Sequence, residues 1–201
     1  MITVRLIREQ DAPVFREVLD AVCRERKHLA MLEAPPIEQV QSFIAANVKS
    51  GGPQFVAEED GRIVGWCDAL PGPAALGRAH IGRLGMGVLI GHRRRRIGRL
   101  LLETTIEGAR EFGLQKIELE VFSSSEPAIA LYRAFGFHEE GRRRRGRFVD
   151  GNYDDILMMA LELDVPSRPQ DPTPASGVPP AARKPRDRWC GSLGGSPAHS
   201  P

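Results

Sequence analysis

Hydrophobic and polar positions follow two different periods along this chain. In the stretch 116–122 (KIELEVF), apolar Ile117, Leu119 and Val121 alternate with polar residues, and a period of two is typical of a strand with one buried face. Between 97 and 112, apolar residues recur every three to four positions, which is typical of a helix that buries one face. The chain is therefore expected to mix strands and helices.

The two periods, together with glycine and proline as breaks, predict seven strands and four helices. The strands are expected at 3–7, 54–58, 62–69, 80–89, 116–122, 137–145 and 153–163, and the helices at 11–27, 37–48, 97–112 and 128–135. The buried side of the first two helices is expected to carry Val14, Leu19 and Val22, then Ile37, Val40, Phe43, Ile44 and Val48. The order βααβββαβαββ predicts a mixed α/β domain with a mostly antiparallel central sheet and helices on both faces.

Short polar motifs predict where several elements begin and turn. Glu59-Asp60-Gly61 is typical of a hairpin loop, with glycine at the position that tolerates positive φ, and a further turn is expected at Asp150-Gly151. Gly113 is expected to end the third helix. Ser123 and Glu126 have capping-box spacing, so we expect them to begin the fourth helix.

The periodic pattern ends near residue 164. The segment 165–201 holds nine prolines among serine, glycine and alanine, a composition that buries too little apolar surface to offset the entropy of ordering. We therefore expect one domain at 1–164 and a disordered, proline-rich tail at 165–201. The chain carries a net charge of +2, whereas residues 1–164 alone hold 23 basic and 24 acidic residues, which argues against a general polyanion-binding domain.

Cysteine content and hydropathy indicate a cytoplasmic protein. Cys23, Cys67 and Cys190 are too few and too scattered for a disulfide framework or a metal site, and the first two lie in apolar surroundings typical of core thiols. The first ten residues lack the apolar stretch of a secretion signal, and no apolar run approaches the ~20 residues that span a bilayer. No membrane partner is expected.

A group of four consecutive arginines, Arg93 to Arg96, separates the expected strand at 80–89 from the helix that begins near Ile97. The first N–H groups of a helix lack internal partners, and the helix dipole places partial positive charge there. A strand that leads through a basic turn into a helix can therefore bind phosphate groups. A solvated basic loop before an ordinary core helix is the alternative.

Two motifs make residues 1 to about 163 resemble the GCN5-related N-acetyltransferase (GNAT) family. The first runs from Val88 through Arg93-Arg-Arg-Arg96-Ile-Gly98, where the family has Arg or Gln, two residues, Gly, one residue, and Gly or Ala. The second is Leu131-Tyr132-Arg-Ala-Phe-Gly136-Phe137, the family's Leu-Tyr…Gly-Phe signature. The element order is also that of the family.

The resemblance implies acetyl-CoA as cosubstrate and no metal. The residues that it places at acetyl-CoA are Met86, Gly87, Val88, Arg93, Arg94, Arg95, Arg96, Ile97, Gly98, Arg99 and Ser125. Backbone N–H groups from Arg94 to Arg99 would hold the pyrophosphate. The end of the fourth strand would bind the pantetheine amides, with the Val88 N–H at the oxyanion.

Two positions depart from the family pattern. Arg96 stands where the family has glycine, and a left-handed backbone there would cost roughly 1 kcal/mol or more relative to glycine. Ser125 stands where many relatives have a cofactor-contacting asparagine. Both departures concern how tightly the cosubstrate binds.

The family mechanism implies one acid and one base. Tyr132 is expected to protonate the departing thiolate, with a core role beside Ile129 and Phe135 as the alternative. A carboxylate, or a water that it holds, would take the proton of the acceptor ammonium, and Glu118 is the first candidate. The other candidates are Glu120, Glu33, Asp68 and Asp154. His80 and His92 are expected to be structural.

The resemblance leads us to expect an enzyme that moves an acetyl group from acetyl-CoA to a primary amine by direct attack in a ternary complex. The acceptor would be a small molecule or a peptide, and Trp66 and the loop 28–36 would flank it. The alternatives are a catalytically weak CoA-binding relative, and a nucleic-acid-binding module that uses the arginine turn and a second cluster, Arg142 to Arg145 with Arg147. The second cluster is expected to be a solvated strand edge or a site for an acidic acceptor. A homodimer is compatible with the sequence.

Overall fold

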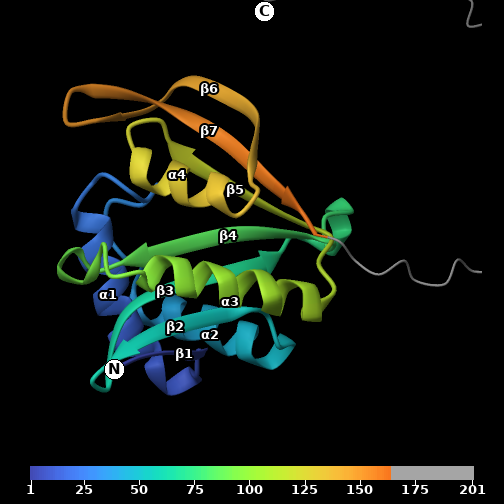
Figure 1. Cartoon of the computed structure of the whole chain (residues 1–201). Coiled ribbons are helices and arrows are strands. Elements are labelled where there is room, and N and C mark those ends of the chain that lie inside the picture. The colour runs from blue at the N-terminus through green and yellow to red at the C-terminus, as the bar shows by residue number, and fades with distance from the viewer. Residues whose placement is uncertain (164–201) are drawn as a thin grey trace, which may run out of the picture. The chain divides into compact units, whose positions relative to one another are not determined.

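The computed structural model describes residues 1–163 and confirms the expected order of elements (Figure 1). The strands are β1 (Ile2–Leu6), β2 (Gln54–Glu59), β3 (Arg62–Pro71), β4 (Ile81–Val88), β5 (Lys116–Phe122), β6 (His138–Val149) and β7 (Asn152–Glu162). The helices are α1 (Ala12–Arg24), α2 (Ile37–Ser50), α3 (Ile97–Phe112) and α4 (Glu126–Ala134), with short 3-10 turns at Glu9–Asp11, Ala74–Leu76 and Ile90–His92. The expected tail at 165–201 lies outside the described residues.

All seven strands form one sheet in the order β1-β2-β3-β4-β5-β7-β6. Every neighbouring pair is antiparallel except β4 and β5, which are parallel. The hairpins form where the sequence predicts them, with left-handed backbone at Asp60 and Gly61 and at Asp150 and Gly151. The fold is thus a mixed α/β domain with a mostly antiparallel sheet.

The parallel pair β4 and β5 separates after a short contact. It covers only three residue pairs, from Ile81↔Lys116 to Arg83↔Glu118. Beyond Arg83, β4 stays paired with β3 up to Val88, while β5 stays paired with β7 up to Phe122. The two strands therefore diverge toward their carboxyl ends (Figure 1), and we call the opening between them the notch.

Each face of the sheet carries its own apolar core. One cluster joins Leu101, Leu102 and Ile106 of α3 and Ile129 and Tyr132 of α4 to the strands. The other joins buried residues of α1 and α2 to the opposite face, where the Phe15 ring meets the edge of Trp66 at 5.5 Å between centroids. The alternation of side chains along β3 follows from this, since Trp66 faces α1 and α2 whereas Cys67 faces α3 and α4.

Some expected core positions of the helices are wrong. Val14 of α1 and Phe43 and Val48 of α2 are exposed. Phe15 and Val18 are buried together with the expected Leu19 and Val22, because positions 15, 18, 19 and 22 share one face of the helix and position 14 lies outside it. In α2 only Val40 and Ile44 are buried, so the helix contacts the sheet along a narrow stripe.

The expected capping box of α4 is also wrong. The helix begins at Glu126 with Ser125 as its N-cap, and neither side chain makes a capping bond. The Ser123 and Ser124 hydroxyls donate instead to the Asp154 carboxylate of β7. A charged acceptor on a neighbouring strand competes better for these hydroxyls than a helix terminus does.

The helices in residues 1–163 are too short or too polar to cross a lipid bilayer.

Candidate active site

The open edge of β4 offers backbone groups to the notch. The Leu89 N–H donates to the Val64 carbonyl of β3 at 2.9 Å, and successive residues of a strand present their backbone groups to opposite edges. Gly87 therefore faces β3, whereas Met86 and Val88 present N–H and C=O groups toward the side where β5 has diverged. Unpaired strand groups of this kind can bind an extended chain that carries amides.

The arginine turn connects this edge to α3 with a strained backbone. Arg94 and Arg96 both have left-handed φ, at 60° and 64°. For a side chain other than glycine, this conformation costs roughly 1–2 kcal/mol per residue. Arg96, which stands at the position of the family's glycine, therefore has the left-handed backbone whose cost the sequence analysis considered.

Arg93 ties the end of β4 to the end of α1. Its Nε donates to the Val88 carbonyl at 2.8 Å, and its two terminal nitrogens bind the Glu25 carboxylate at 2.7 and 2.5 Å. Glu25 follows directly after α1. A two-pronged arginine–carboxylate pair has a defined geometry, so Arg93 fixes the position of the strand end and is already engaged.

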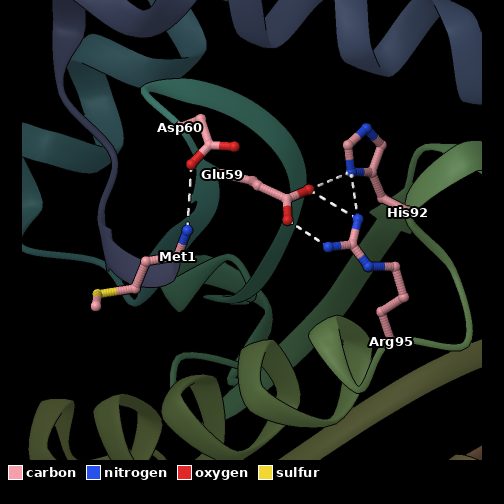
Figure 2. A network of polar contacts seen from close by, with 5 residues as sticks. All are labelled: Met1, Glu59, Asp60, His92 and Arg95. Atoms are coloured by element: carbon pink, nitrogen blue, oxygen red, sulfur yellow. Dashed lines mark hydrogen bonds and ion pairs between the residues drawn. The ribbon is translucent and has the colours of Figure 1, made fainter.

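Arg95 is held in the same way on the other side of the turn. Figure 2 shows its guanidinium and the His92 ring converging on the carboxylate of Glu59, which ends β2. The bond from Arg95 holds the pKa of Glu59 below its usual value. Beside this group, the amino terminus of Met1 pairs with Asp60 at 3.2 Å. The network anchors the turn to the hairpin between β2 and β3.

Three arginines near the turn remain unengaged by acidic groups. Among residues 1–163, Arg94, Arg96 and Arg99 are in no ion pair, and all three are exposed. Arg99 lies over the Phe135 ring of α4, 5.0 Å from its centroid. The sequence predicted phosphate contacts for every arginine from 93 to 99, and the structure divides them into two anchors and three free cations.

The first turn of α3 packs directly against the notch. Ile97 is buried, and a Cβ on Gly98 would lie 2.9 Å from the Met86 side chain and 3.6 Å from that of Leu131. The backbone of α3 can therefore lie close to β4 and α4 only because residue 98 has no side chain. A hollow of about 340 Å³ beside this turn is lined by Arg95, Arg96 and Arg99 among others.

Tyr132 lies in the core on the α3–α4 side of the sheet. Its ring packs at 5.7 Å from the Phe137 ring, and its hydroxyl makes no hydrogen bond to any other residue of the described chain. Burial raises the pKa of Tyr132, and the Cys67 thiol of β3 raises it further. The phenol therefore keeps its proton at neutral pH. Ser125, the other predicted residue on this side, is buried at the start of α4.

The carboxylates proposed as base have different surroundings. Glu118 accepts from Arg78 at 2.5 Å and lies 3.3 Å from Lys116, at the closed end of the notch. Glu120 pairs with Arg143 at 2.9 Å. Asp154 is held by Ser123 and Ser124, and Glu33 is exposed. The role of Glu118 stays a prediction, and none of these four is buried without a partner.

Asp68 differs from the others because it is buried and has no charged partner. Its side chain lies on the α1–α2 side of β3, and 8% of the residue is exposed. Burial raises the pKa of Asp68 to about 7, although the Gly85 amide acts in the opposite direction. In the sequence analysis, Asp68 is one of five candidates for the base and has no preference over the others. Its neighbour Gln54, opposite it on β2, had no local signal at all.

The second arginine cluster lies on edge strand β6, as the sequence predicts. Arg143 binds Glu120, and Arg147 lies 4.3 Å over the Phe122 ring while it donates to the carbonyls of Arg26 and Leu29. These bonds join β6 to the loop after α1. Next to them, a hollow of about 520 Å³ opens between the end of α1 and the β6–β7 hairpin, with Glu25, Lys27, Asp150 and Asp154 in its wall. Trp66, expected beside the acceptor, is buried under Phe15.

Comparisons with known proteins point to one family. The model of the acetyltransferase (GNAT) family matches residues 18–137. An N-alpha-acetyltransferase of Sulfurisphaera tokodaii is 32% identical over 119 residues, which cover 54% of this chain and 68% of that protein. The [ribosomal protein bS18]-alanine N-acetyltransferase of Salmonella typhimurium is 38% identical over 72 residues, covering 36% of this chain and 49% of that protein. This match therefore spans about half the length of the Salmonella relative.

A solved structure shows the same fold. The phosphinothricin acetyltransferase of Sinorhizobium meliloti, solved in complex with AcCoA, aligns with a TM-score of 0.75 at 19% identity, over 81% of this chain and 88% of that one. The family model covers more than half of the chain, and its match includes the notch, the arginine turn and Tyr132. The chain belongs to the GNAT family of acetyltransferases.

Proposed function

We propose that the protein transfers an acetyl group from acetyl-CoA to a primary amine by direct attack of the amine within a ternary complex. The observation that carries this proposal is the notch, where the open backbone of Met86 and the Val88 N–H adjoin the strained arginine turn and the free N-terminus of α3, while the Val88 carbonyl is bound by Arg93. Phosphates and a chain with amide groups require these two kinds of donor side by side.

The residues present fit acetyl-CoA. The N–H groups of the first turn of α3 would bind the pyrophosphate, with Arg94, Arg96 and Arg99 as the cations free to pair with phosphate oxygens. Arg93 and Arg95 would hold the turn in shape through Glu25 and Glu59. Acetyl-CoA supplies an activated thioester. The Val88 N–H would then bind the oxyanion that forms at the thioester carbon.

Tyr132 would supply the proton for the departing thiolate. It lies on the α3–α4 side of the sheet, it is buried, and it keeps its proton at neutral pH. A positioned acid of this kind accounts for roughly 10²- to 10⁴-fold in rate. Glu118 is the first candidate for the base from the sequence. Its carboxylate is held by Arg78 and Lys116.

The acceptor that we propose is the α-amino group of a peptide or protein. The support is that two relatives above 30% identity are named for acetylating such groups, an N-alpha-acetyltransferase and a ribosomal-protein alanine N-acetyltransferase. The hollow between the end of α1 and the β6–β7 hairpin lies open at the surface and is large enough for a few residues of extended chain.

Release of free CoA thiol across a panel of amines tests this proposal. A short peptide with a free N-terminal alanine should react, whereas the same peptide with a blocked N-terminus and an internal lysine should react much more slowly. Polyamines, aminoglycosides and free amino acids complete the panel. No release with any amine would contradict the enzymatic function and favour a CoA-binding relative without turnover.

A titration with short duplex DNA across a salt series tests the alternative of a nucleic-acid-binding module. We expect no binding at physiological salt, since Arg93, Arg95, Arg143 and Arg147 are already engaged within the protein. Binding that weakens steeply with salt and competes with CoA would contradict the assignment of the arginine turn.

A further inference from the structure

Asp68 lies on β3, an inner strand of the sheet, and has a neighbour on the strand to either side. On β2 its neighbour is Gln54, and on β4 its neighbour is Gly85. Residues directly opposite in antiparallel strands have side chains on the same face. The Gln54 and Asp68 side chains thus share the α1–α2 face, where they lie side by side.

Gln54 is fully buried and has an unpaired donor. Its Oε1 accepts from Asn47 of α2 at 2.9 Å, which fixes the orientation of the amide. Its Nε2 has no hydrogen-bond partner, and of the buried side-chain nitrogen and oxygen atoms of residues 1–163 it alone is in this state. A buried donor without a partner is costly and in native proteins is normally bound to water or ligand.

Asp68 and Gln54 do not bond to one another. The hydrogen bonds of the described chain include none from Gln54 Nε2 to the Asp68 carboxylate. A buried amide that donates and a buried carboxylate that accepts thus lie opposite one another in register without a bond between them. One water that accepts from Nε2 and donates to Asp68 would satisfy both groups.

Only the backbone of Gly85, which has no side chain, lies between the Asp68 carboxylate and the notch. A Cβ at this position would lie 3.1 and 3.2 Å from the two carboxylate oxygens of Asp68. Pairing between β4 and β5 ends at Arg83, so Gly85 lies two residues inside the diverging part of the sheet. β3 and β4 are neighbours in the sheet and stay paired here. The missing side chain lets the carboxylate lie over the β4 backbone, one strand away from the notch.

We propose that Asp68 is the general base of acetyl transfer, which binds the acceptor's ammonium beside the notch while Gln54 fixes the carboxylate through a bound water. This inference rests on the proposed function. In this proposal one carboxylate oxygen accepts from the bound water, and the other receives the proton of the amine. The acceptor therefore approaches from the α1–α2 side, opposite Tyr132.

Each acetyl transfer releases one proton from the acceptor to the solvent. The ammonium gives one proton to the Asp68 carboxylate, which becomes a neutral acid and later releases that proton to water. The freed amine forms the C–N bond, the C–S bond breaks, and the thiolate leaves with the proton of Tyr132. The second proton lost by the nitrogen restores the phenol, so one proton in total reaches the solvent.

The surroundings of Asp68 suit this role. The titratable side chains on the elements packed around it are Arg16, Glu17, Asp20, Cys23 and Arg24 of α1, Glu38 and Lys49 of α2, Glu58 and Glu59 of β2, Arg62 and Cys67 of β3, Arg83 of β4, and Lys116, Glu118 and Glu120 of β5. None of them is hydrogen-bonded or ion-paired to Asp68, and α2 presents the neutral Asn47 on this side. Burial raises the pKa of Asp68 to about 7, and a base works best when its pKa lies near the working pH.

The test is the pH dependence of kcat/KM for the full chain, with acetyl-CoA and a peptide that begins with alanine. The wild-type profile should fall on the acid side with a midpoint near pH 7. Asp68→Asn should lower kcat/KM at least roughly 10²-fold and remove that limb, with the Kd for acetyl-CoA unchanged. Gln54→Met, which removes the amide at similar size, should shift the limb and leave most of the rate.

Glu107→Gln is the matched control, because Glu107 is an exposed carboxylate on α3. It should keep both the rate and the profile. The proposal is overturned if Asp68→Asn keeps the rate and the acid limb, or if Glu118→Gln or Glu120→Gln alone removes that limb.

A second measurement does not depend on turnover. In carbon NMR spectra, the carboxyl resonance of Asp68 is assigned as the one that is present in the wild type and missing from Asp68→Asn. This resonance should titrate near pH 7 when CoA is bound. Adding the alanine peptide should move that titration to lower pH, because an ammonium stabilises the carboxylate. A resonance that ignores the peptide overturns the assignment of Asp68, whereas absence of thiol release with every amine, together with a responsive resonance, contradicts only the proposed turnover.

Discussion

Four identical residues, Arg93 to Arg96, have two different roles because of where their side chains can reach. Arg93 and Arg95 meet carboxylates on α1 and β2, whereas Arg94 and Arg96 adopt left-handed backbone and extend into solvent. An arginine already bound in a two-pronged pair is a poor phosphate ligand, since binding the phosphate would leave the carboxylate unpaired. At the scale of single residues, backbone conformation and neighbours decide function more than residue type does.

Tyr132→Phe tests the proposed acid. The hydroxyl has no partner among residues 1–163, so its loss should leave the packing against Phe137 and the stability nearly unchanged. Turnover should fall roughly 10²-fold, near the lower end for one positioned acid, because a thiolate is already a fair leaving group. Steady-state rates and acetyl-CoA affinity measured together check this. A rate within a few-fold of wild type would exclude the acid role, and an equal loss of affinity would indicate that the hydroxyl positions the thioester.

Asp68 should also make stability depend on pH. Its pKa is near 7 in the folded protein and near 4 in the unfolded chain, so the folded state holds more protons between these values. The contribution of Asp68 to stability is therefore fully present below about pH 4 and is lost as the pH rises toward 7, at about 1.4 kcal/mol per unit of pKa difference. Denaturant titrations at several pH values should show that the free energy of unfolding of Asp68→Asn changes less with pH than that of the wild type. Identical pH dependence in the two proteins would contradict the buried, unpaired state of this carboxyl.

At the scale of elements, the site depends on strands that stop pairing. A parallel pair that continued to Val88 and Phe122 would occupy the backbone groups of Met86 and Val88. The divergence after Arg83 leaves the Met86 groups and the Val88 N–H free of strand pairing. It also brings the end of β4 next to the first turn of α3, which packs against it at Gly98. A strand edge and a helix terminus become neighbours in this way.

Acetyl-CoA should raise the melting temperature of the protein, because a ligand that binds only the folded state stabilises it by mass action. Gly98→Leu should abolish that shift, since a side chain there would occupy the space between β4, α3 and α4. Gly91→Ala is the control, as a Cβ at residue 91 meets nothing within 4 Å, and it should keep the shift. No shift for the wild type at millimolar acetyl-CoA would contradict the cosubstrate.

At the scale of the whole domain, the sheet separates two cores, and the proposed acid and the proposed base lie on opposite sides of it. Tyr132 belongs to the core under α3 and α4, whereas Asp68 and Gln54 lie on the side of α1 and α2. An acid on one side that protonates the sulfur and a base on the other that deprotonates the nitrogen can serve the same thioester carbon only where the sheet is open, which is the notch. Arg93 joins these two sides, since it links β4 to the end of α1.

Removing residues 165–201 should leave stability and thiol release unchanged within error. All seven strands, both cores and every residue proposed for the site lie within residues 1–163. Thermal unfolding and turnover of the shortened chain, compared with the full chain, provide the check. A large fall in either would show that the tail contributes to the domain.

The sequence by itself determined the elements and the family. Alternation in 116–122 and helical spacing in 97–112 place β5 and α3 to the residue, because burial on one face imposes these periods on local sequence. The turn at Asp150-Gly151 likewise depends on neighbours in the chain, and it forms as predicted. The arginine motif and the Leu131–Phe137 motif carried the resemblance to the GNAT family for the same reason, since each is contiguous.

Only the tertiary structure decided which side chains meet. The anchors Glu25 and Glu59 lie 68 and 36 residues away from Arg93 and Arg95. The Ser123 hydroxyl, which was expected to cap a helix, donates instead to Asp154, 31 residues further along the chain. Gln54 faces Asp68 through strand register, and the burial that sets the pKa of Asp68 comes from elements spread over the domain. Ion pairs, desolvation and register depend on distance in space, and no local pattern in the sequence encodes that distance.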